Sequence, residues 1–404
     1  MRVLMVAPGT RGDVAPMAGL GSKLQEHGFE VAVAGNPAYE SVVVSAGCEY
    51  RELPGSLTRI IQRGAAGAEP AASGVLESWR GLRTYMDQAA TGTLAAAERG
   101  ADLIMANSVA PYAYDVGEAL GIPVIGAHLQ PVEPSAAYPP VMLCSARNLG
   151  RLGNRLIGER VASGPAPYDA PSARIRRELG LPKLSRQTAD RRRRSSKATI
   201  LHGISPTVLP RPADWHDGLT MGGYWWPPAR PEWKPDSSLV DFLAAGPPPV
   251  YVGFGSGAQL DADLALEAVR LAGVRAVLQG GGVQEPDAIS VEDVPHEWLF
   301  PRMAAVVHHA GSGTTAAGLL AGVPTVCVPV FTDQPLWASR VAALGAGPGP
   351  IPFKQLTAGR LAAAIKAAVS TSSYADRARV LAASIVAEDG VAPVLDALRR
   401  VQSM

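Results

Sequence analysis

The sequence predicts an α/β protein with two doubly wound parallel-sheet domains, and three observations support this fold class. The chain has 404 residues, more than the roughly 250–300 residues at which a single core stops growing. Hydrophobic residues make up 47% and charged residues 18%, a composition that can build large cores. Short apolar runs alternate with helical patterns in both halves of the chain, which is typical of parallel sheets covered by helices.

The first domain is expected to span residues 1–210. Its alternation predicts strands at 3–7, 31–34, 103–106, 124–127 and 199–202, and helices after Asp13 and at 39–46, 84–99 and 113–120. Residues 53–83 and 130–171 are interrupted by glycine, alanine and proline, and we interpret them as long loops of the kind that often carry substrate contacts. The arginine run at 191–194 is interpreted as a solvated polar loop.

Residues 211–236 are dense in proline and tryptophan, so they are expected to link the domains and to pack against both. The second domain is expected over 237–385, with strands at 250–253, 276–278, 306–308 and 325–328 and helices after Asp261 and at 313–321 and 335–344. Residues 386–404 have a helical period and are expected to pack back onto the first domain.

Charge and cysteine content exclude several classes of protein. The 37 basic and 36 acidic side chains nearly balance, so no general affinity for nucleic acid or acidic membranes is expected. The three cysteines match neither a disulfide framework nor a zinc cluster. No apolar run approaches the roughly 20 residues of a membrane span, and the N-terminal run is too short for a secretory signal. We therefore expect no stable membrane insertion and a cytoplasmic location, whereas the oligomeric state stays open.

The most informative segment is the turn from His309 to Thr315, which follows an apolar strand and opens a helix. Its backbone N–H groups and the positive end of the helix dipole would face a phosphate. Gly311 and Gly313 allow close approach, and Ser312 and Thr314 add hydroxyl donors. The alternative is an ordinary strand-to-helix turn with a Ser/Thr cap.

This turn, the preceding His308 and the later pair Asp333-Gln334 resemble the donor signature of inverting, nucleotide-sugar-dependent glycosyltransferases of family 1, which have the GT-B fold of two Rossmann-like domains facing a cleft. The segments GTRGD (9–13), PPPVYVGFGS (247–256) and PHEWLFPR (295–302) resemble the branch of sterol glucosyltransferases and bacterial antibiotic glycosyltransferases. Ala310 stands where that branch usually has glycine.

The resemblance implies a role for each matching residue. It implies that His309 and the N–H groups of Gly311, Ser312, Gly313 and Thr314 hold the donor diphosphate, with Ser256 as a further phosphate contact. Asp333 and Gln334 would bind hydroxyls of the sugar, and Val294 and His296 would bracket the nucleobase and ribose. The alternatives are a strand-end histidine without a ligand role for His308 and His309, and a helix N-cap for Asp333.

The resemblance also implies a catalytic base, since an acceptor hydroxyl is a weak nucleophile until a base removes its proton. Asp13, in the first strand-to-helix loop, is the candidate, and Arg11 and Gly12 would reach the donor diphosphate. The alternative is that Asp13 merely caps the first helix. His128 and Glu133 follow a strand and could orient an acceptor, or they could be ordinary loop side chains.

No metal or other cofactor is expected. Asp261 and Asp263 have the spacing of a metal-binding DxD motif, but they begin a predicted helix, where acidic residues favour the dipole. No His/Cys cluster has metal-ligand spacing either.

The sequence thus predicts transfer of a hexose from a UDP- or dTDP-sugar to a hydroxyl of an apolar small molecule, by direct displacement with Asp13 as base. Predominance of arginine over lysine, with abundant alanine, glycine and proline, is typical of a GC-rich bacterial genome and favours a secondary-metabolite aglycone such as a polyketide or glycopeptide. The alternatives are a sterol or lipid glucosyltransferase, a nucleotide-sugar epimerase, and a non-catalytic nucleotide-sugar-binding protein.

Overall fold

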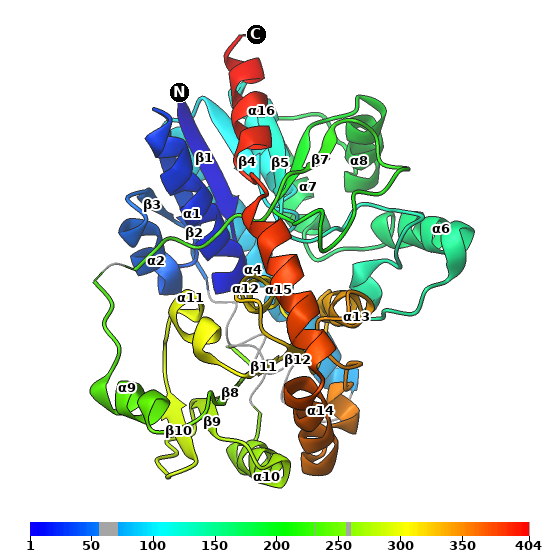
Figure 1. Ribbon diagram of the computed structural model, residues 1–404. Helices are drawn as coiled ribbons and strands as arrows, with labels where there is room; N and C mark the ends of the chain where they lie inside the picture. The colour runs from blue at the N-terminus through cyan, green and yellow to red at the C-terminus, as the bar shows by residue number, and fades with distance from the viewer. Residues whose placement is uncertain (56–71, 231, 256–259, 404) are drawn as a thin grey trace. The chain divides into compact units, whose positions relative to one another are not determined.

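The computed structural model divides the chain into two compact units (Figure 1). Unit 1 comprises Met1–Pro140, Asn148–Ala229 and Glu388–Met404, and unit 2 comprises Val141–Arg147 and Arg230–Ala387. The structure describes residues 1–55, 72–230, 232–255 and 260–403. Each unit is built on a parallel sheet with helices, so the predicted fold class is confirmed.

Unit 1 contains a seven-stranded sheet in the order β3-β2-β1-β4-β5-β6-β7, and every neighbouring pair is parallel. Its strands are β1 (Arg2–Ala7), β2 (Glu30–Gly35), β3 (Glu49–Glu52), β4 (Leu103–Ala106), β5 (Val124–His128), β6 (Ile200–His202) and β7 (Leu219–Met221). The central strands β1 and β4 are almost entirely buried, because apolar clusters cover both of their faces. That double burial explains their continuous apolar sequence.

The helices of unit 1 are α1 (Arg11–Glu26), α2 (Glu40–Ser45), α4 (Ala72–Glu98), α5 (Tyr112–Leu120), α6 (Gly150–Ala162), α7 (Asp169–Glu178), α8 (Arg186–Ser195) and α16 (Ala392–Gln402). Helix α16 is the last helix of the chain, drawn in red in Figure 1. It packs into the core of unit 1 through Val394, Leu395 and Leu398, which join the cluster around β1 and α1.

Unit 2 contains a five-stranded parallel sheet in the order β10-β9-β8-β11-β12. Its strands are β8 (Val250–Gly253), β9 (Ala276–Gln279), β10 (Ala288–Val291), β11 (Ala305–His308) and β12 (Thr325–Cys327). Its helices are α9 (Ser237–Ala244), α10 (Ala262–Ala272), α11 (His296–Leu299), α12 (Ser312–Leu320), α13 (Gln334–Ala343), α14 (Ala358–Ser370) and α15 (Ser372–Val386). The central strands β8 and β11 are fully buried.

Three predicted loops are wrong at least in part, because they contain helices. Helix α4 begins at Ala72, inside the predicted loop 53–83, of which residues 56–71 lie outside the described residues. Residues 130–171 include α6 and the start of α7, and the arginine run lies on α8. Helix α6 buries only Asn154 and Gly158, and α8 buries no residue. Neither helix therefore carries the apolar stripe by which a sequence pattern reveals a helix. Arg193 instead places its guanidinium 4.2 Å from the centre of the Tyr114 ring.

The segment predicted as a linker, 211–236, also differs from its expected role. Residues up to Ala229 belong to unit 1, where β7 extends the sheet next to β6. Three residues are too few to show the alternation of a strand. Trp225 is buried, and its indole N–H donates to the carbonyl of Gly390, 2.9 Å away, so this tryptophan has a packing role within unit 1.

Asp261 is the N-cap of α10, and its carboxylate accepts a hydrogen bond from the N–H of Asp263 at 3.0 Å. Within the described residues, no helix is both long and apolar enough to cross a membrane.

Candidate active site

Three turns meet at one edge of the unit 2 sheet, because β8, β11 and β12 are neighbours and run in parallel. The turn after β8 contains Gly255, the turn after β11 contains His309 to Gly313, and the turn after β12 leads to Asp333. Ligands of open α/β sheets bind outside the carboxyl ends of the strands. The topology therefore brings together most of the predicted donor residues. Ser256 lies outside the described residues.

His308 ends β11 and shapes the turn from inside the unit. It is fully buried, and its Nδ1 accepts a hydrogen bond from the N–H of Ala310 at 2.9 Å. Burial, with His309 and His296 nearby, holds the pKa of His308 well below its usual range. His308 is therefore a neutral strand-end histidine that fixes the turn, which is the structural alternative considered for it.

Ala310 adopts a left-handed conformation with φ of +62°. For a residue with a β-carbon this conformation costs about 1–2 kcal/mol, and glycine adopts it without that cost. The geometry explains why the resembling branch has glycine at this position. In this chain the turn stores modest backbone strain next to the site.

His309 packs between glycines from two turns. A β-carbon on Gly311 would lie 2.5 Å from Nε2 of His309, and one on Gly255 would lie 3.2 Å from its Cε1. Within the described part of the chain, Nδ1 of His309 is buried without a hydrogen-bond partner. Burial lowers the pKa of His309 to about 4. The ring is therefore neutral near pH 7 and has a buried polar atom to satisfy.

The N-terminus of α12 is an uncapped helix end. Gly311 occupies the N-cap position without a side-chain cap, so the first N–H groups of the helix are available. A β-carbon on Gly313 would meet nothing within 4 Å, which shows open space beside the first turn. Uncapped N–H groups, a helix dipole and open space are the features that suit an anion at a helix N-terminus.

Asp333 stands at the N-cap of α13, but its side chain makes no capping hydrogen bond. Oδ2 accepts from the indole N–H of Trp337 at 2.6 Å, and Oδ1 accepts from the hydroxyl of Thr332 at 3.0 Å. Burial raises the pKa of Asp333, while these hydrogen bonds oppose the shift. The carboxylate of Asp333 is therefore held by Trp337 and Thr332 and does not cap the helix.

Gln334 and the nucleobase residues have different local roles. Oε1 of Gln334 accepts from the N–H groups of Val330 and Phe331 at 2.8 and 3.1 Å, which orders the loop after β12 and leaves Nε2 as its donor for a ligand. Val294 packs on the apolar cluster of unit 2. His296 begins α11 and stacks on Phe300 at a centroid distance of 4.2 Å.

In unit 1, the two carboxylate oxygens of Asp13 have different partners. Oδ2 accepts from the backbone N–H of Thr10 at 2.9 Å and completes a capping box at the start of α1. Oδ1 lies 3.4 Å from Nδ2 of Asn107 and 3.4 Å from Nε2 of Gln130. These residues follow β4 and β5, so Asp13 caps the helix and also faces the carboxyl edge of the sheet.

Arg11 and Gly12 form the first turn of α1 with Asp13. Arg11 is the first residue of the helix and is exposed. The N–H of Gly12 also donates to the hydroxyl of Thr10, at 3.3 Å, in addition to the capping box that Thr10 forms with Asp13.

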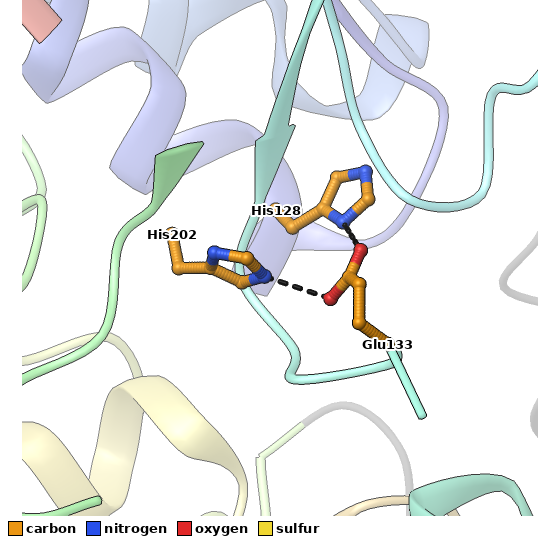
Figure 2. Close-up of side chains that lie close together, drawn as sticks. All are labelled: His128, Glu133 and His202. Atoms are coloured by element: carbon orange, nitrogen blue, oxygen red, sulfur yellow. Dashed lines mark hydrogen bonds and ion pairs between the residues drawn. The ribbon is translucent and has the colours of Figure 1, made fainter. Parts of the chain in front are cut away.

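His128 and Glu133 lie at the same edge, together with a histidine that sequence reasoning missed (Figure 2). Oε1 of Glu133 lies 2.7 Å from Nδ1 of His128, and Oε2 lies 2.7 Å from Nε2 of His202. Burial raises the pKa of Glu133, but the two histidines outweigh it and hold that pKa well below its usual range. The signal for His202 is topological, because His128 and His202 end adjacent strands as register partners. The three side chains could hold a metal ion.

Comparison with known families agrees with this architecture. The profile of the glycosyltransferase family 28 N-terminal domain matches residues 3–139. The profile of the erythromycin biosynthesis protein CIII-like C-terminal domain matches residues 260–400.

Two curated relatives cover most of the chain. It is 35% identical to O-mycaminosyltylonolide 6-deoxyallosyltransferase of Streptomyces fradiae, covering 97% of this chain and 95% of that enzyme. It is 32% identical to the sterol 3-beta-glucosyltransferase UGT80A2 of Arabidopsis thaliana, covering 98% of this chain. The chain spans 65% of that longer plant enzyme and 27% of the similar sterol glucosyltransferase of Neurospora crassa.

Solved structures share the fold over the whole chain. The glycosyltransferase VinC in complex with dTDP has a TM-score of 0.68 at 20% identity, and the match covers 100% of both chains. The calicheamicin glycosyltransferase CalG4 has a TM-score of 0.70 at 15% identity, covering 100% of this chain and 98% of CalG4. With its two parallel-sheet units and these relatives, the chain belongs to the GT-B glycosyltransferases, in the group that includes antibiotic and sterol glycosyltransferases.

Proposed function

We propose that this glycosyltransferase moves a hexose from a UDP- or dTDP-sugar to a hydroxyl of an apolar small molecule, with inversion at the anomeric carbon. The observation that carries the proposal is the uncapped N-terminus of α12, which has open space at Gly313 and the buried, unpartnered Nδ1 of His309 beside it. VinC, which shares the fold, is described in complex with dTDP.

The donor diphosphate binds in this proposal at the first turn of α12. The N–H groups of Ser312, Gly313 and Thr314 and the ring of His309 contact its oxygens, and the helix dipole stabilises the negative charge that grows as the nucleotide leaves. A neutral His309 can donate one hydrogen bond to a phosphate oxygen. The leaving group is thus stabilised by the protein's own donors, without a metal ion at the diphosphate.

The sugar is held by the loop between β12 and α13. Asp333 is oriented by Trp337 and Thr332, so its remaining lone pairs have a defined direction for sugar hydroxyls. Nε2 of Gln334 donates to a second hydroxyl while its Oε1 keeps the loop in place.

Asp13 accepts the proton of the acceptor hydroxyl as that oxygen attacks the anomeric carbon. Because Oδ2 is used by the capping box, Oδ1 is the oxygen that takes the proton. The 3.4 Å contacts from Asn107 and Gln130 to Oδ1 are long, so a hydroxyl can replace them. General-base removal of the proton is worth about 10²–10⁴-fold in rate.

The acceptor class follows from the relatives and from composition. The deoxyallosyltransferase is named for O-mycaminosyltylonolide and matches nearly the full length of this chain, so a secondary-metabolite aglycone is the first choice. A sterol is the second candidate, because a sterol glucosyltransferase is 32% identical over 98% of the chain. In both cases we place the acceptor at the carboxyl edge of the unit 1 sheet, next to Asp13, where the outer nitrogen of His128 contacts it and Glu133 orients His128.

The proposal is tested by calorimetric titration of the full chain with UDP, dTDP, UDP-glucose and dTDP-glucose, with and without a chelator. Micromolar binding of one nucleotide series, unchanged by the chelator, is the expected result. That series then serves as donor in parallel assays with O-mycaminosyltylonolide and a sterol as acceptors. If none of the four ligands bound, the proposed donor site would be contradicted. A new epimer formed without an acceptor would instead indicate an epimerase.

A further inference from the structure

The side chains of His128, Glu133 and His202 form a buried cluster in unit 1, which we call the His–Glu–His cluster. His128 and His202 are 7% and 2% exposed, and the side chain of Glu133 is 12% exposed. Figure 2 shows the carboxylate lying between the two imidazoles, one oxygen toward each ring. Ligand atoms of the three residues lie within 4.8 Å of one another.

The hydrogen bonds of His202 fix where its lone pair points. Its Nδ1 lies 3.1 Å from the carbonyl oxygen of Thr220, and a carbonyl can only accept, so Nδ1 carries the proton. In the neutral ring Nε2 is then a bare lone pair, and it faces Oε2 of Glu133 at 2.7 Å. Two acceptors at this distance repel unless a positive species lies between or beside them.

His128 supplies the second nitrogen of the cluster. Its Nδ1 lies 2.7 Å from the other carboxylate oxygen of Glu133. Within the described residues this buried nitrogen has no partner that meets hydrogen-bond geometry, so the two atoms are close without an aligned hydrogen bond. A close but misaligned pair of polar atoms, taken from water, is costly unless both bind a third species.

We propose that Nδ1 of His128, Nε2 of His202 and the carboxylate of Glu133 bind a divalent transition-metal ion, with Zn²⁺ the best match. Two imidazoles and one carboxylate are a common donor set for zinc, at metal–ligand distances of about 2.0–2.2 Å. Around a tetrahedral ion such ligand atoms lie about 3.4 Å apart, so each 2.7 Å nitrogen–oxygen pair opens slightly to admit the ion. The carboxylate also neutralises half of the ion's charge inside the protein.

The surroundings support metal binding. A histidine ligand usually donates its other nitrogen to a carbonyl or carboxylate, which fixes its tautomer and raises its basicity, and the Thr220 carbonyl does this for His202. Trp215 stacks on the His202 ring at a centroid distance of 4.7 Å and holds its plane.

A bound ion would fix the position of the loop that follows β5. His128 and Glu133 lie at either end of a segment that contains Gln130, whose amide contacts Asp13. An ion bound to both ends fixes this segment on β6. The inference stands on the cluster alone and does not depend on the transferase proposal. The site lies in unit 1, whereas the proposed diphosphate site lies in unit 2.

The test is zinc binding by the full chain, stripped with a chelator, dialysed, and titrated with zinc chloride at pH 7. We expect one ion per chain and a higher unfolding temperature with zinc. Glu133→Gln keeps the size of the side chain but replaces the carboxylate. It should weaken zinc binding at least about 100-fold, beyond the 10- to 100-fold loss that removal of an outer partner causes. His27→Ala is the control for adventitious binding, since His27 is exposed and its Nδ1 lies against the carbonyl of Lys23 in its own helix; it should bind zinc like the wild type.

His128→Ala is the second variant, chosen because His128 is less deeply buried than His202. Circular dichroism checks that each variant is folded. Cobalt added in place of zinc should show the visible absorption of a histidine-bound ion, absent in Glu133→Gln. Absence of stoichiometric zinc binding by the wild type, or equal zinc binding by Glu133→Gln, would overturn the proposal. The positive species between Glu133 and His202 would then be a shared proton. Either of these results would leave the nucleotide titrations unaffected, so the two proposals fail separately.

Discussion

The carboxylate of Asp13 lies directly against the α-carbon of Gly9. A β-carbon built on Gly9 would lie 1.9 Å from Oδ2 of Asp13, closer than any two non-bonded atoms can approach. Glycine at position 9 is therefore required by the packing of a side chain four residues later. This contact places the proposed base as firmly as its own hydrogen bonds do.

Gly9→Ala should displace the Asp13 carboxylate and leave the rest of the unit folded. Since misplacing a catalytic group by about 1 Å can cost about 10²-fold, we expect kcat to fall by at least 10-fold at unchanged nucleotide affinity. Gly359→Ala is the control, because Gly359 is exposed on helix α14 and a β-carbon there meets nothing within 4 Å. Turnover of Gly9→Ala equal to that of this control would show that the carboxylate position is unimportant.

Asp13→Asn should separate catalysis from helix capping. The amide oxygen can still accept from the N–H of Thr10, so the free energy of unfolding should change by less than about 1 kcal/mol, but the amide cannot take a proton. We expect kcat to fall by about 10²–10⁴-fold with nucleotide affinity retained. Thr10→Ala removes the other half of the capping box and should lower stability by about 1 kcal/mol with a much smaller loss of kcat. If Asp13→Asn instead kept its kcat, Asp13 would have only its capping role.

Gly313→Ala should weaken donor binding without harming the fold. A β-carbon there contacts no protein atom within 4 Å, and alanine favours a helix by up to about 1 kcal/mol over glycine, so thermal stability should be equal or higher. The methyl group occupies the proposed diphosphate space, and we expect Kd for the preferred nucleotide to rise at least 10-fold, or about 1.4 kcal/mol. Unchanged Kd, measured by calorimetry, would place the diphosphate elsewhere.

His309 should make the protein less stable in acid. Its pKa in the fold is about 4 against an ordinary value of 6.5, so the unfolded chain takes up a proton first as the pH falls. The stability contributed by the neutral ring is complete above about pH 6.5 and is lost progressively toward pH 4, by at most about 3 kcal/mol. His309→Asn should show a shallower fall of unfolding free energy over this range in denaturant titrations. Parallel pH profiles for both proteins would contradict the shift.

The framework of both sheets could be predicted from the sequence because its strands are buried on two faces. Runs such as Val3–Ala7 and Leu103–Ala106 are apolar without a break, as is typical of strands in a parallel sheet that is covered on both sides. The glycine turn at Gly311 could be located for the same reason, since it directly follows such a run. The helices α6 and α8 could not, because almost none of their side chains reach a core.

The donor residues were predicted from the glycine turn and from the family resemblance, but the contacts that orient them were not. The hydrogen bond from Trp337 to Asp333 is an i, i+4 contact that the structure adds. Glu133 and His202, in contrast, are 69 positions apart, and only the order of strands β5 and β6 brings them together. The split of Asp13 between an oxygen that caps the helix and an oxygen that faces Asn107 and Gln130 is likewise a matter of orientation, which no spacing encodes.

The contact between Trp337 and Asp333 has an optical consequence. Trp337 is fully buried, and its indole N–H donates to the carboxylate proposed to bind the sugar. Indole fluorescence depends on the charge and hydrogen bonding around its nitrogen, so a ligand that draws on this carboxylate should change the emission of Trp337. The protein thus carries its own fluorophore one hydrogen bond from the proposed sugar site. Donor binding can therefore be followed by intrinsic tryptophan fluorescence, without an attached dye.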